Sequence, residues 1–117
     1  MSCRVLVVED DADLREMMAQ ILTLEGFEAE TATDGADALT QLQAPGRYPD
    51  VILLDMMMPR MDGWEFCREQ RRDPALAHIP VVVLSAAPRE WLQISAAAVL
   101  SKPFDYDRLL AAIRINC

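Results

Sequence analysis

The chain has 117 residues, of which 52% are hydrophobic and 26% are charged, a composition that fits one compact globular domain over residues 1–117. Its 19 acidic and 11 basic residues give a net charge of −8, which disfavours direct binding to nucleic acid or to anionic lipid. The apolar stretches are too short for insertion into a membrane, and the start MSCRVLVVED carries no signal-peptide pattern.

The cysteines predict no special chemistry. Cys3, Cys67 and Cys117 are odd in number and far apart, so their spacing indicates neither a disulfide framework nor a zinc site. We therefore expect a reducing, cytoplasmic environment.

The first third of the chain alternates between strand and helix patterns. Residues 4–8 (RVLVV) form a β-branched run typical of a buried strand. The apolar side chains of residues 14–22 recur at helical spacing, with Asp11 or Asp13 as the N-cap. Residues 27–32 alternate in polarity and predict a second, more exposed strand.

The middle third repeats the pattern. Asp34 and Gly35 open a second helix, which ends at the Pro- and Gly-containing segment 45–49. Residues 51–54 are apolar and predict a third buried strand, and residues 64–72 predict a third helix.

The last third completes five strand–helix units. Residues 81–84 predict a fourth buried strand, followed by a helix near 89–96 and a short strand at 98–100. Asp105 caps a last helix over 106–113. Strict alternation with buried strands predicts an α/β domain, a doubly wound five-stranded parallel sheet with helices on both faces.

Polar side chains stand at the carboxyl ends of these strands, where open parallel sheets bind ligands. Glu9 and Asp10 follow the first strand, Asp55 the third, Ser85 the fourth and Lys102 the fifth. Two like charges about 5 Å apart repel by roughly 3 kcal/mol, so the three carboxylates favour a hard divalent cation such as Mg²⁺. A carboxylate neutralised in this way can accept a phosphoryl group, with the ammonium and the hydroxyl close to its oxygens.

Most of these residues also have an ordinary structural explanation when they are taken alone, and Asp55 after an apolar strand can simply start a loop. Asp10, like its acidic neighbours, can cap a helix; Ser85 suits a turn; and Lys102 before a proline is a common surface residue. Their joint occurrence at successive strand ends favours the phosphoacceptor interpretation.

The segments VLVVEDD, VILLDMMMPRMDG, VVVLSA and SKPFD, in this order, resemble the receiver domain of bacterial two-component response regulators. The resemblance covers essentially the whole chain and implies the flavodoxin-like strand order 2-1-3-4-5. It implies that Asp55 is the phosphoacceptor, and that Mg²⁺, for which Mn²⁺ is a possible substitute, is held by the carboxylates of Glu9, Asp10 and Asp55 and by the backbone carbonyl of Met57.

The same resemblance assigns the phosphoryl-binding and switch roles. Lys102 pairs with the phosphoryl group, Ser85 supplies a hydroxyl that moves toward it, and the bond before Pro103 is cis, a geometry nearly confined to proline. The implied partners are a sensor histidine kinase or a histidine phosphotransfer protein, and a downstream protein target or attached output domain.

Two features depart from the family pattern. Val99 stands where receivers usually carry the Tyr or Phe whose rotamer reports phosphorylation, so the switch position is degenerate. The segment between Ser85 and Lys102 is several residues shorter than the family's, so the helix near 89–96 should be short or irregular. We therefore expect a non-standard output face.

Two other functions compete with the phosphorylated switch. A pseudo-receiver would keep the fold and signal by binding alone. A phosphatase or phosphotransferase with an aspartyl nucleophile commonly has a second Asp two residues later, where this chain has Met57, so we expect no enzyme activity on an external substrate.

Overall fold

The computed structural model describes residues 2–44, 48–58, 60–86 and 96–117. The strands are all parallel and lie in the order β2-β1-β3-β4-β5, which confirms the predicted doubly wound sheet and its flavodoxin-like order. The elements are β1 (Arg4–Val8), α1 (Ala12–Leu24), β2 (Glu28–Ala32), α2 (Gly35–Gln43), β3 (Val51–Asp55), α3 (Gly63–Arg72), β4 (Val81–Ser85), β5 (Ala98–Ser101) and α4 (Tyr106–Ile115).

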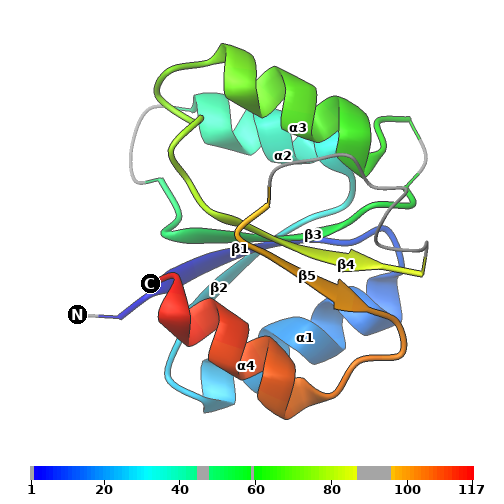
Figure 1. Cartoon of the computed structure of the whole chain (residues 1–117), viewed down its shortest axis with the longest axis vertical. Coiled ribbons are helices and arrows are strands. Elements are labelled where there is room, and N and C mark those ends of the chain that lie inside the picture. Colours follow the sequence, from blue (N-terminus) through cyan, green and yellow to red (C-terminus); the bar gives the residue numbers. More distant parts are fainter. Residues whose placement is uncertain (1, 45–47, 59, 87–95) are drawn as a thin grey trace.

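The sheet separates two hydrophobic cores. Alternate residues along a strand point to opposite faces, so Leu6 and Val8 enter one core while Val5 and Val7 enter the other. Helices α2 and α3 cover the first face, and α1 and α4 cover the second (Figure 1). Burial on both faces explains why the three central strands are almost wholly apolar.

Each of the four described helices has an aspartate as its N-cap. Asp11 is the N-cap of α1 and accepts hydrogen bonds from the backbone N–H groups of Asp13 and Leu14. Asp34 and Asp105 cap α2 and α4 in the same way. These bonds satisfy backbone donors that have no partner within the helix, and they settle the choice between Asp11 and Asp13.

Several element boundaries differ by one residue from those predicted. β3 includes Asp55 and β4 includes Ser85. Each of these polar residues is therefore the last residue of its strand and not the first of the following loop. The segment predicted as a short or irregular helix near 89–96 falls almost wholly outside the described residues.

The prediction of no disulfide is wrong. Cys3 and Cys117 form a disulfide bond, with their Cα atoms 5.7 Å apart. The sequence gives no sign of this pairing, because the two cysteines are 114 residues apart and only the folded sheet brings the start of β1 beside the end of α4. Cys67 remains a buried free thiol, whose pKa is raised by its burial.

Within the described ranges, none of the helices has the length and apolar character needed to cross a bilayer.

Candidate functional site

An acidic cluster lies at the carboxyl ends of β1 and β3. The two strands pair in parallel with Val8 opposite Leu54, so the residues that follow this pair come together. One carboxylate oxygen from each of Glu9, Asp10 and Asp55 lies within 4.8 Å of the others. Glu9 and Asp55 are buried and Asp10 is exposed, so the cluster opens to solvent on one side.

Burial and crowding change the acidity of Glu9. Its side chain is 1% exposed, and removal from water disfavours its charged form. Burial first, and then the neighbouring carboxyls of Asp55 and Asp10, raise the pKa of Glu9 from its usual 4.5 to about 8, against an opposing backbone contact from Asp11. Without a cation, this carboxyl therefore holds a proton at neutral pH.

The cluster fits a hard cation. Oε1 of Glu9 is buried and has no hydrogen-bond partner among the described residues. A buried acceptor without a partner carries a free-energy cost, and a bound divalent ion would remove it. All-oxygen donors with an open, solvated side are the donor set that Mg²⁺ prefers.

Lys102 is the cation that pairs with Asp55 in the site. It directly follows β5, and its Nζ lies 3.2 Å from Oδ1 of Asp55. Its backbone N–H donates to the carbonyl of Ser85 over 2.9 Å, which fixes the loop after β5 against the end of β4. The Lys102–Pro103 peptide bond is cis.

The two predicted switch positions lie on neighbouring strands. Ser85 is buried at the end of β4 and pairs in register with Ser101 of β5. Val99 pairs with Val83 and is half-buried, packed against the core beneath α2 and α3. The structure therefore places Ser85 at the same end of the sheet as Asp55, whereas Val99 lies within β5 as a half-buried side chain that packs against the core.

Met57 lies in the loop that follows β3. Its backbone N–H donates to Oδ1 of Asp55 over 3.2 Å, which sets the start of this loop against the acidic cluster. The loop closes where Gly63 donates to the carbonyl of Met56. A Cβ on Gly63 would lie 2.7 Å from the Cα of Met56, so glycine is needed for this close approach.

Two further contacts of the site were missed by the sequence analysis. The Arg60 guanidinium in the β3–α3 loop forms an ion pair with the buried Asp34 carboxylate, with Nε 2.7 Å from Oδ2. Arg15 on α1 donates from its guanidinium to the carbonyl of Glu9 over 3.0 Å. Asp34 was recognised as the start of a helix, but no spacing in the sequence relates it to Arg60.

Comparison with known proteins gives one consistent result. The family model described as "Response regulator receiver domain" matches residues 5–114. The chain is 43% identical to the response regulator PleD of Caulobacter vibrioides over 97% of this chain and 26% of that protein. It is 39% identical to the phosphate regulon transcriptional regulatory protein PhoB of Escherichia coli over 97% of this chain and 51% of that protein. The chain thus spans between a quarter and about half of these relatives.

Solved structures agree with the sequence matches. The chemotaxis protein CheY4 of Vibrio cholerae aligns with a TM-score of 0.88 and 33% identity over the full length of both chains. The receiver domain of a signal transduction histidine kinase from Syntrophus aciditrophicus aligns with a TM-score of 0.88 and 30% identity, covering 97% of this chain and 89% of that one.

Proposed function

Because this chain belongs to the receiver domain family of response regulators, we propose that it is a phosphorylated switch whose phosphoacceptor is Asp55. The observation that carries the proposal is the contact between a buried carboxylate and a single ammonium. Asp55 is 4% exposed and lies 3.2 Å from Nζ of Lys102, beside two further carboxyls.

Glu9, Asp10 and Asp55, together with the backbone carbonyl of Met57, would hold Mg²⁺, or Mn²⁺ in its place. The ion would neutralise the acidic cluster and the negative charge of the incoming phosphoryl group. Glu9 supports this assignment because its Oε1 is buried without a partner in the described chain.

In the proposed step, a carboxylate oxygen of Asp55 attacks the phosphorus of a phosphohistidine. A P–O bond forms to Asp55 and the P–N bond breaks, with its electron pair leaving on the imidazole nitrogen, which takes up a proton. Lys102 already lies beside the accepting carboxylate and would pair with the transferred group. The Ser85 hydroxyl would donate a hydrogen bond to one of its oxygens.

The donor would be a sensor histidine kinase or a histidine phosphotransfer protein, and the phosphorylated state would be relayed to a downstream protein or an attached output domain. Such a donor draws its phosphoryl group from ATP, so we place the domain in the cytoplasm. We expect no turnover of an external substrate, because Met57 cannot act as the acid or base that aspartyl phosphatases place two residues after the nucleophile.

We propose that the output face is not the one most receivers use. Val99 has no aromatic ring to change rotamer, and it packs against the core within β5. Hydrogen exchange measured with and without beryllofluoride would test this. Protection changes confined to the 89–96 segment, β5 and α4 would contradict it.

The first experiment is intact-mass measurement after incubation with acetyl phosphate and Mg²⁺. Transfer of one phosphoryl group adds about 80 Da to the parent and nothing to Asp55→Asn. Asp13→Asn, an exposed acid in the first turn of α1, is the matched control and should gain the same mass as the parent.

The alternative, a pseudo-receiver that signals without phosphorylation, predicts a different result. The parent would bind Mn²⁺, measured by electron paramagnetic resonance, but would gain no mass. Addition of beryllofluoride, a stable phosphoryl mimic, would leave its hydrogen exchange unchanged. Loss of Mn²⁺ binding in Glu9→Gln and Asp10→Asn separates failure of the metal site from failure of phosphoryl transfer.

A further inference from the structure

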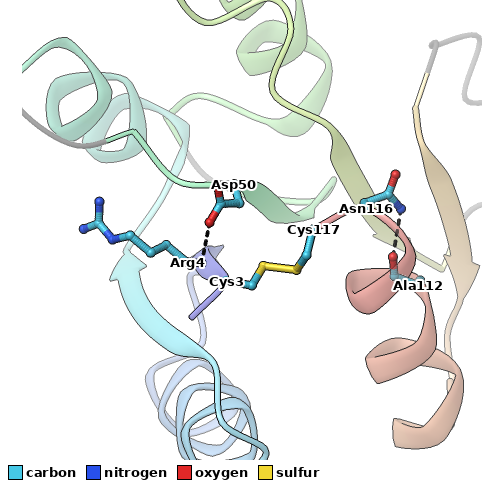
Figure 2. Close-up of a disulfide and its surroundings, with 6 residues drawn as sticks. All are labelled: Cys3, Arg4, Asp50, Ala112, Asn116 and Cys117. Atoms are coloured by element: carbon cyan, nitrogen blue, oxygen red, sulfur yellow. Dashed lines mark hydrogen bonds between the residues drawn. A yellow bond between two sulfur atoms is a disulfide. The ribbon is translucent and has the colours of Figure 1, made fainter. Parts of the chain in front are cut away.

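The Cys3–Cys117 disulfide lies at the end of the sheet opposite the acidic cluster. Cys3 directly precedes β1, whereas Glu9 and Asp10 follow the carboxyl end of the same strand. Figure 2 shows the bond between Cys3, just before β1, and Cys117, which follows α4 in the chain. The proposed phosphoacceptor chemistry has no role for either cysteine.

Both sulfurs belong to residues that solvent reaches. Cys117 is exposed and Cys3 is half-buried, and their Cα separation of 5.7 Å lies in the usual range for disulfides. Cys67 differs from both because it is 3% exposed and burial raises the pKa of its thiol. A small thiol or disulfide can therefore reach Cys3 and Cys117, whereas Cys67 should not react with it.

The backbone on both sides of the bond is held by other contacts. The carbonyl of Cys3 accepts a hydrogen bond from the N–H of Glu28 over 2.9 Å. Near the end of α4, the Arg114 guanidinium pairs with Glu25 over 2.9 Å and lies over the ring of Phe27 at 5.7 Å.

The apolar face of α4 adds a second anchor. Leu109 and Ile113 are fully buried in the core beneath α1 and α4, so the helix stays docked when the disulfide opens. The two thiols then remain close together, which favours closure of the bond over capture by separate small molecules.

We propose that Cys3 and Cys117 form a reversible oxidative-modification site, closed by low-molecular-weight disulfides and opened by low-molecular-weight thiols. The site is independent of the proposed phosphoryl chemistry, and its test does not depend on it.

In the closing reaction, the exposed Cys117 thiolate attacks one sulfur of a small disulfide RSSR. A mixed disulfide forms and one RS⁻ leaves. The Cys3 thiolate then attacks Sγ of Cys117, forming the Cys3–Cys117 bond and releasing the second RS⁻. The two cysteines lose two electrons and two protons, and RSSR is reduced to two RSH.

Closure would stabilise the domain without a new packing contact. A cross-link between residues 114 positions apart removes much of the conformational freedom of the unfolded chain. For a loop of this size, the unfolding equilibrium constant should fall by a factor on the order of a thousand. The corresponding rise in Tm is roughly 10 °C or more.

The test is a redox titration of the whole chain in glutathione buffers of varied ratio, followed by acid quenching, denaturing alkylation and intact mass. We expect one transition, from a form alkylated at all three cysteines to a form alkylated at Cys67 alone, with Cys3 and Cys117 joined in the peptide map. Cys67→Ala should show the same transition, and Cys117→Ser should show none.

Three results would overturn the proposal. The parent could form a stable glutathione adduct, or keep free thiols at every ratio. Its pair could also stay closed in excess reduced glutathione under native conditions. Urea unfolding of the oxidised and reduced forms provides a second readout. Equal midpoints would contradict stabilisation of the domain by closure of the bond, and Cys117→Ser should unfold like the reduced parent in both buffers.

Discussion

Arg60 and Asp34 join two loops that are far apart in the sequence, with Nε of the guanidinium 2.7 Å from Oδ2 of the carboxylate. Asp34 is 2% exposed and caps α2, and Arg60 reaches it from the loop that carries Met57. Arg60 has a φ of 63°, an uncommon value for a residue with a side chain. The ion pair therefore braces the loop after β3 against α2.

Removing the guanidinium should destabilise the fold measurably. Arg60→Ala leaves the buried Asp34 carboxylate without its ionic partner, and we expect a loss of about 1–2 kcal/mol in the free energy of unfolding. Urea denaturation at pH 7 measures this loss. Arg72→Ala is the matched control, because Arg72 pairs with Glu69 on the exposed face of α3 and should change stability by less than about 0.5 kcal/mol. Equal losses in both variants would contradict the brace.

The same pair predicts a shift in acid unfolding. Although burial alone would raise it, the pKa of Asp34 is lowered below 3.8 by hydrogen bonds from the Asp37 backbone and the Arg60 side chain. A depressed folded-state pKa stabilises the protein above the unfolded-state pKa, and this contribution is lost as the pH falls through the folded value. In Arg60→Ala the loss should begin at a higher pH. Circular dichroism during acid titration measures the midpoint, and an unchanged midpoint would refute the assignment.

In metal-free protein, Glu9 should make the free energy of unfolding depend on pH in the opposite direction. Its folded pKa of about 8 lies above the usual 4.5, so its contribution is fully present below pH 4.5 and is lost as the pH rises through 8. In EDTA, the free energy of unfolding should fall across this window for the parent and fall less for Glu9→Gln. Denaturant unfolding at several pH values gives both slopes. Parallel slopes would mean that Glu9 is already ionised in the folded state.

Met57 should prolong the life of the phosphorylated state. Its side chain is 63% exposed beside the acidic cluster, where an apolar group neither orients nor activates the hydrolytic water. We expect Met57→Asn to shorten the lifetime about tenfold, which corresponds to a barrier lowered by about 1.4 kcal/mol. Intact mass recorded over time measures this lifetime as the loss of the added phosphoryl group. Met57→Leu, which keeps the apolar character, should match the parent, and an equal lifetime in all three proteins would refute the role.

Much of this architecture follows from local pattern. The runs at residues 4–8, 51–54 and 81–84 are apolar because both faces of their strands are buried, and this is visible without a fold. The placement of Glu9, Asp55 and Lys102 together follows once the strands are parallel, because their carboxyl ends must share an edge. Periodicity and chain order predict the parallel sheet and the shared end, whereas the strand order that puts β1 beside β3 was implied only by the resemblance to receiver domains.

Contacts between distant segments could not be predicted in this way. The bond between Cys3 and Cys117 and the ion pair between Arg60 and Asp34 depend on which loops the finished sheet brings together. Neither pair has a characteristic spacing, and each member has an ordinary explanation by itself. Asp34 was interpreted as a helix start, which is correct but incomplete.

The disulfide also changes the topology of the molecule. With Cys3 joined to Cys117 across 114 positions, all the described strands and helices lie within one covalent ring. A protease that cuts once in any enclosed loop then opens the ring without releasing a fragment, and the cut ends stay tethered through the sulfur atoms. In its oxidised form the domain therefore loses a piece of chain only after two backbone cuts within the ring, and not after one.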